Sequence, residues 1–163
     1  MKIFNCSRKY VETHKAELEA DNSLFVVSIN DFCKNDDRTG KDSCCPPISP
    51  KHGIVLFFDD ATPVDIGRKG ITKVFDRKMA HFILESVEDA LKNTEITHIL
   101  VHCSAGISRS AAVSRILNDF VNSVLAENEV DWEYNDKHGF ELSPTPNPHI
   151  LATMRSVLYD EFL

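Results

Sequence analysis

Two kinds of apolar pattern alternate along this chain, and that alternation constrains its fold more than any other feature. Four short runs of branched and aromatic residues are typical of buried β-strands, and the segments between and after them repeat apolar residues every three or four positions, as amphipathic helices do. Because strands that alternate with helices build parallel sheets, we expect an α/β protein with a mostly parallel central sheet flanked by helices. The predicted strands are residues 2–6, 23–29, 53–58 and 98–103, and the predicted helices lie within 7–21, 72–92, 110–125 and 147–162. Ser7 is the expected N-cap of the first helix, and Asn147, followed by a proline, is the expected N-cap of the last.

Length and charge narrow the class of protein. A chain of 163 residues is expected to form a single domain over residues 1–163. The formal net charge of −7 argues against nucleic-acid or anionic-membrane partners, which require a basic surface. No apolar run approaches the roughly 18 to 20 residues of a membrane span, and the N-terminal residues lack the apolar stretch of a secretory signal. We therefore expect a cytoplasmic protein, and nothing in these properties sets its oligomeric state.

The stretch ILVHCSAGISRSAA carries the chemistry of the chain. A predicted strand ends at His102 and Cys103, residues Ser104–Ser108 have no large side chain, and Arg109 and Ser110 begin a predicted helix. Small residues before a helix N-terminus let backbone N–H groups surround an anion, and a guanidinium adds forked donors that match two phosphate oxygens. Helix N-termini and neighbouring cations lower thiol pKa values, so we expect a nucleophilic thiolate at the floor of this loop. The histidine is expected either to orient the loop or to be a satisfied core residue.

These residues resemble the signature HCxxGxxR[ST] of the cysteine-based protein tyrosine phosphatases. By length the chain is most similar to their compact dual-specificity-like branch, and VVSIND and SPTPNPHI resemble a bacterial and phage subgroup, so that the similarity spans roughly residues 23 to 160. The resemblance implies the dual-specificity type of phosphatase fold and the following roles. Cys103 is the nucleophile, Ser110 donates a hydrogen bond to its sulfur, and the phosphate is bound by Ser104, Ala105, Gly106, Ile107, Ser108 and Arg109.

Hydrolysis of a phosphate monoester also needs an acid that protonates the leaving oxygen. In this family the acid is an aspartate on a loop upstream of the signature, and LFFDDATP is similar to the aspartate loops of compact members. Asp60 aligns best with that acid. Asp59 and Asp65 are the competing candidates, because a slip of one position at the end of a strand reverses which side chain faces the site.

The implied reaction is hydrolysis of phosphotyrosine in proteins or peptides, with phosphoserine and phosphothreonine as further substrates, through a cysteinyl-phosphate intermediate and without a metal or cofactor. The alternatives are an RNA 5′-phosphatase of the same fold, against which the acidic charge argues, and a catalytically silent phosphate-binding module. Pocket depth would depend on the 31–52 loop and on 127–146, which is predicted to be irregular. Trp132, Tyr134 and Phe140 are expected to line the rim or cap the core.

The remaining cysteines are interpreted as structural. Five cysteines in a chain without an export signal do not indicate a disulfide framework, and their spacing lacks the paired C-x-x-C motifs of a zinc site. Cys6 and Cys33 are expected to be small apolar side chains. The adjacent Cys44 and Cys45 are expected to be incidental loop residues or, alternatively, to supply a disulfide partner for an oxidised Cys103.

Overall fold

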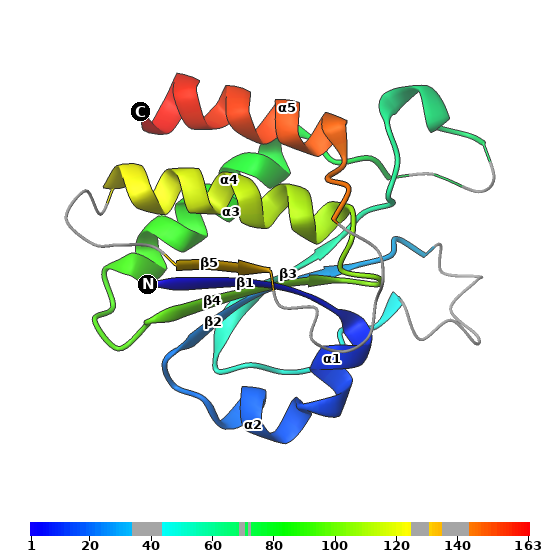
Figure 1. Cartoon of the computed structure of the whole chain (residues 1–163). Coiled ribbons are helices and arrows are strands. Elements are labelled where there is room, and N and C mark those ends of the chain that lie inside the picture. The colour runs from blue at the N-terminus through cyan, green and yellow to red at the C-terminus, as the bar shows by residue number, and fades with distance from the viewer. Residues whose placement is uncertain (34–43, 69–70, 72, 125–130, 135–143) are drawn as a thin grey trace.

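The computed structural model of the chain describes residues 1–33, 44–68, 71, 73–124, 131–134 and 144–163 (Figure 1). Its centre is a sheet with the strand order β3-β2-β4-β1-β5, in which every neighbouring pair is parallel. The prediction of an α/β protein with a parallel sheet is therefore confirmed. The strands are β1 (Lys2–Ser7), β2 (Leu24–Asn30), β3 (His52–Phe57), β4 (His98–Cys103) and β5 (Asp131–Tyr134).

Helices cover both faces of the sheet. One face carries α1 (Arg8–Thr13) and α2 (Lys15–Ala20), and the opposite face carries α3 (Arg77–Leu91), α4 (Arg109–Val124) and α5 (Pro148–Val157) (Figure 1). A short 3₁₀ helix, η3 (Pro63–Asp65), follows β3, and α5 continues into a π-helical turn, η4 (Leu158–Phe162).

Each face of the sheet has its own apolar cluster. The larger cluster, packed by the three long helices, includes the fully buried rings of Phe58, Phe75 and Phe120. The smaller cluster lies on the side of α1 and consists of Cys6, Val11, Leu24, Val26, Ile48 and Leu100. The expectation that Cys6 is a small buried apolar side chain is therefore confirmed. Burial on both faces explains why β2 and β4 read as nearly continuous apolar runs.

The segment predicted to be a helix from residue 72 becomes helical only at Arg77. Asp76 stops the helix from extending further back, because its side chain accepts a hydrogen bond from the amide of Met79 at 2.9 Å and caps the first turn. Phe75 matches the helical pattern for a different reason. Its ring packs on Phe58 with 5.0 Å between ring centroids, so tertiary packing rather than helix formation requires an apolar residue there.

The first predicted helix is divided in two. Ser7 caps α1 as expected, since its hydroxyl accepts a hydrogen bond from the amide of Tyr10 at 3.2 Å. His14 separates α1 from α2 and stacks on the ring of Tyr10, with 4.2 Å between ring centroids. An apolar spacing that spans 7–21 therefore comes from two short helices that lie on the same side of the sheet.

The prediction that 127–146 is irregular is wrong for one part of it. Residues Asp131–Tyr134 form β5, which extends the sheet beyond β1. A strand of four residues gives too short a pattern to recognise, and its pairing with β1 is what defines it. Residues 125–130 and 135–143, including Phe140, lie outside the described part of the chain, as do residues 34–43 and the side chains of Trp132 and Tyr134.

The order of the strands produces a topological switch point at the carboxyl ends of β1 and β4. β1 and β4 are neighbours, with Ser7 paired to Cys103, but the chain leaves β1 through α1 on one face and leaves β4 through α4 on the other (Figure 1). Loops that diverge from adjacent parallel strands leave a gap at the carboxyl ends, where ligands of open α/β sheets bind. The loop after Cys103 lies at this point.

Candidate active site

The loop from Cys103 to Ser110, called the 103–110 loop below, is anchored by neighbouring segments that donate hydrogen bonds to its carbonyl oxygens. Four of them accept hydrogen bonds from residues on other segments. In a planar trans peptide the N–H that follows a carbonyl points the opposite way, so these bonds turn the next N–H groups toward the inside of the loop. The pairs are Arg8 N to Ser104 O (3.2 Å), Asn5 Nδ2 to Gly106 O (2.8 Å), Thr145 N to Ile107 O (3.0 Å) and Asn147 N to Ser108 O (3.2 Å).

Gly106 is required at the turn of this loop for two reasons. Its φ is +76°, a left-handed conformation that side chains with a Cβ disfavour. A Cβ at this position would also lie 2.6 Å from the carbonyl carbon of Cys6 and 2.7 Å from the amide nitrogen of Ser7, both backbone atoms of β1. The glycine therefore lets the loop lie directly against the end of β1, where Asn5 binds it.

Cys103 lies at the floor of the loop. The residue is only 2% exposed, and its Sγ accepts a hydrogen bond from the backbone N–H of Gly106 at 3.2 Å. The hydroxyl of Ser110 lies 3.1 Å from the same sulfur. The loop thus brings together the predicted nucleophile and the predicted serine donor.

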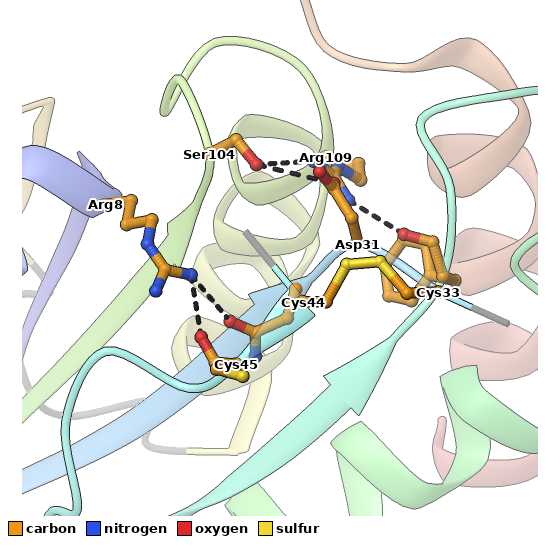
Figure 2. Close-up of a disulfide and its surroundings, with 9 residues drawn as sticks. Arg8, Asp31, Cys33, Cys44, Cys45, Ser104 and Arg109 are labelled. Atoms are coloured by element: carbon orange, nitrogen blue, oxygen red, sulfur yellow. Dashed lines mark hydrogen bonds and ion pairs between the residues drawn. A yellow bond between two sulfur atoms is a disulfide. The ribbon is translucent and has the colours of Figure 1, made fainter. Parts of the chain in front are cut away.

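Arg109 is 4% exposed, and its guanidinium is held in a fixed orientation (Figure 2). Nη1 donates to the carbonyl oxygen of Phe58 at 2.8 Å, and Nη2 donates to Ser104 Oγ at 3.1 Å. Nη2 also lies 2.7 Å from Oδ1 of Asp31, with which it forms an ion pair. Nε is buried and has no partner among the described residues, so one donor of the fork remains for a ligand.

Asp31 is a candidate site residue that the sequence analysis missed. It directly follows β2, and β2 is the neighbour of β4 in the sheet, so the parallel arrangement places its carboxylate beside Arg109. The available signal was a carboxylate immediately after a buried strand in VVSIND, but the adjacency of β2 and β4 is a tertiary property.

Asp60 is hydrogen-bonded to the loop, whereas the contacts described for the two competing aspartates are with other segments. Its Oδ1 accepts hydrogen bonds from Ser108 Oγ at 2.7 Å and from Asn147 Nδ2 at 2.9 Å. Among the described residues no hydrogen bond reaches its Oδ2. Asp59 instead accepts from the amide of Lys73 at 3.0 Å, and Asp65 accepts from the amide and the hydroxyl of Thr62 to cap η3.

Asn147 has two roles, of which the sequence indicated one. As predicted, it caps the last helix, since its Oδ1 accepts from the amides of His149 and Ile150 at 3.0 and 3.2 Å. Its Nδ2 donates to Asp60, and its backbone N–H donates to Ser108. One residue therefore connects the start of α5, the aspartate and the 103–110 loop.

His102 is a buried histidine of β4 that directly precedes the 103–110 loop. It is fully buried on β4, and its Nε2 lies 2.8 Å from the hydroxyl of Ser28, which also accepts a hydrogen bond from Asn30 Nδ2 at 3.0 Å. Loss of solvation, together with the charges of Arg8 and Arg109, lowers the pKa of His102 from 6.5 to about 4, although a hydrogen bond with the backbone of Cys103 acts in the opposite direction. The imidazole is therefore neutral at physiological pH.

The expectation that Cys33 is a simple apolar side chain is wrong. Cys33 and Cys44 form a disulfide, with 5.8 Å between their Cα atoms, at the exit of β2 and on the approach to β3 (Figure 2). Both cysteines lie in the connection between β2 and β3, eleven positions apart in the chain, so the disulfide closes a loop within that connection. Cys44 is thus bonded to Cys33 rather than to Cys103, while Cys45 is exposed and binds Arg8 Nη1 through its carbonyl oxygen at 2.7 Å.

Comparisons of the chain with protein-family models, with curated proteins and with solved structures gave no match. In the described part of the chain, no group of three or more His, Cys, Asp or Glu side chains is arranged to hold a metal ion. None of the helices that the structure describes combines the length and apolar character needed to cross a membrane.

Proposed function

We propose that this chain is a phosphomonoester hydrolase with the dual-specificity type of phosphatase fold, which acts on phosphotyrosine in proteins, and on phosphoserine and phosphothreonine, through a cysteinyl-phosphate intermediate. The observation that carries the proposal is the placement of the Cys103 sulfur. It lies at the floor of a loop that is anchored from outside through its carbonyl oxygens, where it accepts a hydrogen bond from the N–H of Gly106, and the same loop ends in the buried guanidinium of Arg109.

In the first step the Cys103 thiolate attacks the phosphorus atom. The S–P bond forms while the bond between phosphorus and the leaving oxygen breaks, and Asp60 gives its proton to that oxygen. Oδ1 of Asp60 is anchored by Ser108 and Asn147, so Oδ2 is the oxygen that carries the proton. The inward amides and Arg109 stabilise the negative charge on the three equatorial oxygens without having to reorganise.

In the second step water attacks the cysteinyl phosphate. Asp60 accepts a proton from the water, an O–P bond forms, and the S–P bond breaks to return the thiolate. Ser110 Oγ, 3.1 Å from the sulfur, donates a hydrogen bond that stabilises the departing anion. No metal or cofactor enters either step.

The fixed orientation of Arg109 supports this mechanism. A guanidinium free to rotate would lose entropy each time it bound a phosphate, whereas this one is positioned in advance by Asp31 and by the carbonyl of Phe58. Phosphoproteins are favoured over RNA because the chain has a net charge of −7 and because two carboxylates, Asp31 and Asp60, contact the loop or its arginine.

Hydrolysis of p-nitrophenyl phosphate tests the proposal. We expect turnover by the wild-type protein and none by Cys103→Ser. Asp60→Asn should lower kcat by about 10²- to 10⁴-fold and remove one limb of the bell-shaped pH profile, because the general acid is lost. Asp59→Asn is the matched control and should keep the wild-type kcat and both limbs of the pH profile. Phosphate binding without turnover by the wild type would instead indicate a silent binding module, and full activity of Asp60→Asn would show that the acid is another residue.

A further inference from the structure

A small cavity lies beside the candidate active site, and the mechanism does not use it. Its volume is about 230 Å³, and its lining in the described part of the chain is Phe32, Cys33, Cys44, Cys45 and Phe57. The two aromatic residues are 38% and 39% exposed, whereas Phe25, Phe58, Phe75 and Phe120 are buried. An opening of this kind, with aromatic walls accessible to solvent, is suited to an apolar ligand group.

Two residues that line the cavity are chain neighbours of the residues that anchor Arg109. Phe32 follows Asp31, whose carboxylate lies 2.7 Å from Arg109 Nη2, and Phe57 precedes Phe58, whose carbonyl accepts from Arg109 Nη1. Consecutive Cα atoms are about 3.8 Å apart, so each aromatic residue is one residue step from an atom that holds the guanidinium. Figure 2 shows the Cys33–Cys44 disulfide beside Asp31.

The size and chemistry of the cavity limit what can occupy it. Pockets that enclose a whole small molecule usually measure about 300–1,000 Å³, so 230 Å³ is suited to one side chain rather than to a complete ligand. No charged side chain is present among the described lining residues, and two phenylalanine rings with cysteine sulfur atoms form an apolar surface. An apolar side chain would gain from burial there, whereas a carboxylate would lose solvation without finding a partner.

We propose that this cavity, called the Phe32–Phe57 pocket below, is a specificity subsite for an apolar side chain of the phosphorylated protein, located one or two residues from the phosphorylated residue. The inference rests on the proposed function, because it places the phosphate in the 103–110 loop. An extended peptide rises about 3.3 Å per residue, so a neighbour one or two positions away lies about 3–7 Å along the chain from the phosphorylated residue. In the protein, Phe32 and Phe57 are likewise chain neighbours of the residues that anchor Arg109. A side chain close to the phosphorylated residue is therefore the one expected to reach the pocket.

Peptides that differ only next to phosphotyrosine test the subsite. Each has a glycine background, with leucine placed in turn at positions −2, −1, +1 and +2. We expect leucine at one of these positions to raise kcat/KM of the wild-type protein about 10-fold over the glycine peptide, the effect of burying part of an apolar side chain. Phe57→Ala and Phe32→Ala should bring that ratio close to one, and Phe82→Ala should leave it unchanged. Phe82 is the matched control, because it is 46% exposed on α3 outside the pocket.

Binding to the Cys103→Ser variant separates failure of the subsite from failure of the catalytic proposal. Fluorescence anisotropy should show the same preference for the leucine peptide, and that preference should require the phosphate. Phosphate-dependent preference without turnover by the wild type would support the subsite and contradict the hydrolase. All four leucine peptides within about twofold of the glycine peptide, in rate and in binding, would overturn the subsite and leave the hydrolase standing. A preference that persists in both pocket variants would also overturn it.

Discussion

Replacing Gly106 by alanine tests the contact between the 103–110 loop and the end of β1. The substitution adds one methyl group at a residue with φ of +76°, where the new Cβ would lie 2.6–2.8 Å from three backbone atoms of Cys6 and Ser7. None of these atoms can rotate away as the end of a side chain can, so either the loop or the end of β1 must move. Gly67 offers a matched control, because its φ is +83° but nothing lies within 4 Å of an added Cβ.

The two substitutions share one cost and differ in the other. Placing an alanine in the left-handed region costs about 1–2 kcal/mol at either position. Overpacking against fixed backbone adds about 1–3 kcal/mol, and this second cost applies only at Gly106. We therefore expect Gly67→Ala to lower the free energy of unfolding by about 1–2 kcal/mol and Gly106→Ala to lower it by about 2–5 kcal/mol.

Urea unfolding of both variants, with the wild type, measures this difference, provided that the slope m is unchanged. Gly106→Ala should also lower kcat on p-nitrophenyl phosphate by about 10²-fold or more, because the amide that donates to the Cys103 sulfur is displaced. Equal destabilisation by the two substitutions would refute the reasoning, since it would mean that the loop does not press against β1.

Three further perturbations test separate parts of the structure. The folded-state pKa of His102, about 4, lies below its unfolded value of 6.5, so the unfolded chain binds more protons between these pH values and stability falls as the pH falls. Urea unfolding of the wild type should therefore show a loss of about 3 kcal/mol over this pH range, and His102→Gln should not show it. Cys33→Ser should cost about 3 kcal/mol by opening the disulfide loop, whereas Cys45→Ser should change stability by less than about 0.5 kcal/mol; equal losses would contradict the pairing. Asp31→Ala should lower kcat/KM about 10- to 100-fold by releasing Arg109. In an Arg109→Ala background the same substitution should have little further effect, and a full additional loss there would show that the aspartate acts independently.

Local patterns in the sequence predicted most of the fold. Long segments with a regular apolar spacing gave α3, α4 and α5, and continuous branched runs gave β2 and β4, because burial imposes a periodicity on each element. The predictions that failed concern a short strand and a helix start that is set by a capping side chain. β5 has only four residues, and α3 begins where the side chain of Asp76 caps it rather than where the apolar pattern begins.

The candidate site could be predicted where it is contiguous in the chain or where a resemblance pointed to it. Cys103, Arg109 and Ser110 lie within one loop, and Asp60, chosen by the resemblance, is hydrogen-bonded to that loop through Ser108. Asp31 comes from the end of β2, and Asn5 comes from β1; their roles depend on which strands are neighbours, which no local pattern specifies. The disulfide within the connection from β2 to β3 was missed because five cysteines and the expected lack of an export signal argued against a disulfide.

The central claim is that the 103–110 loop holds a tetrahedral anion directly over the sulfur of Cys103. A crystal structure of the protein with vanadate bound measures this most directly. We expect vanadium in line with Cys103 Sγ, its equatorial oxygens on the loop amides and on Arg109, and its apical oxygen facing Oδ2 of Asp60. Vanadate bound away from the sulfur, or an Asp60 carboxylate turned away from the apical oxygen, would contradict it.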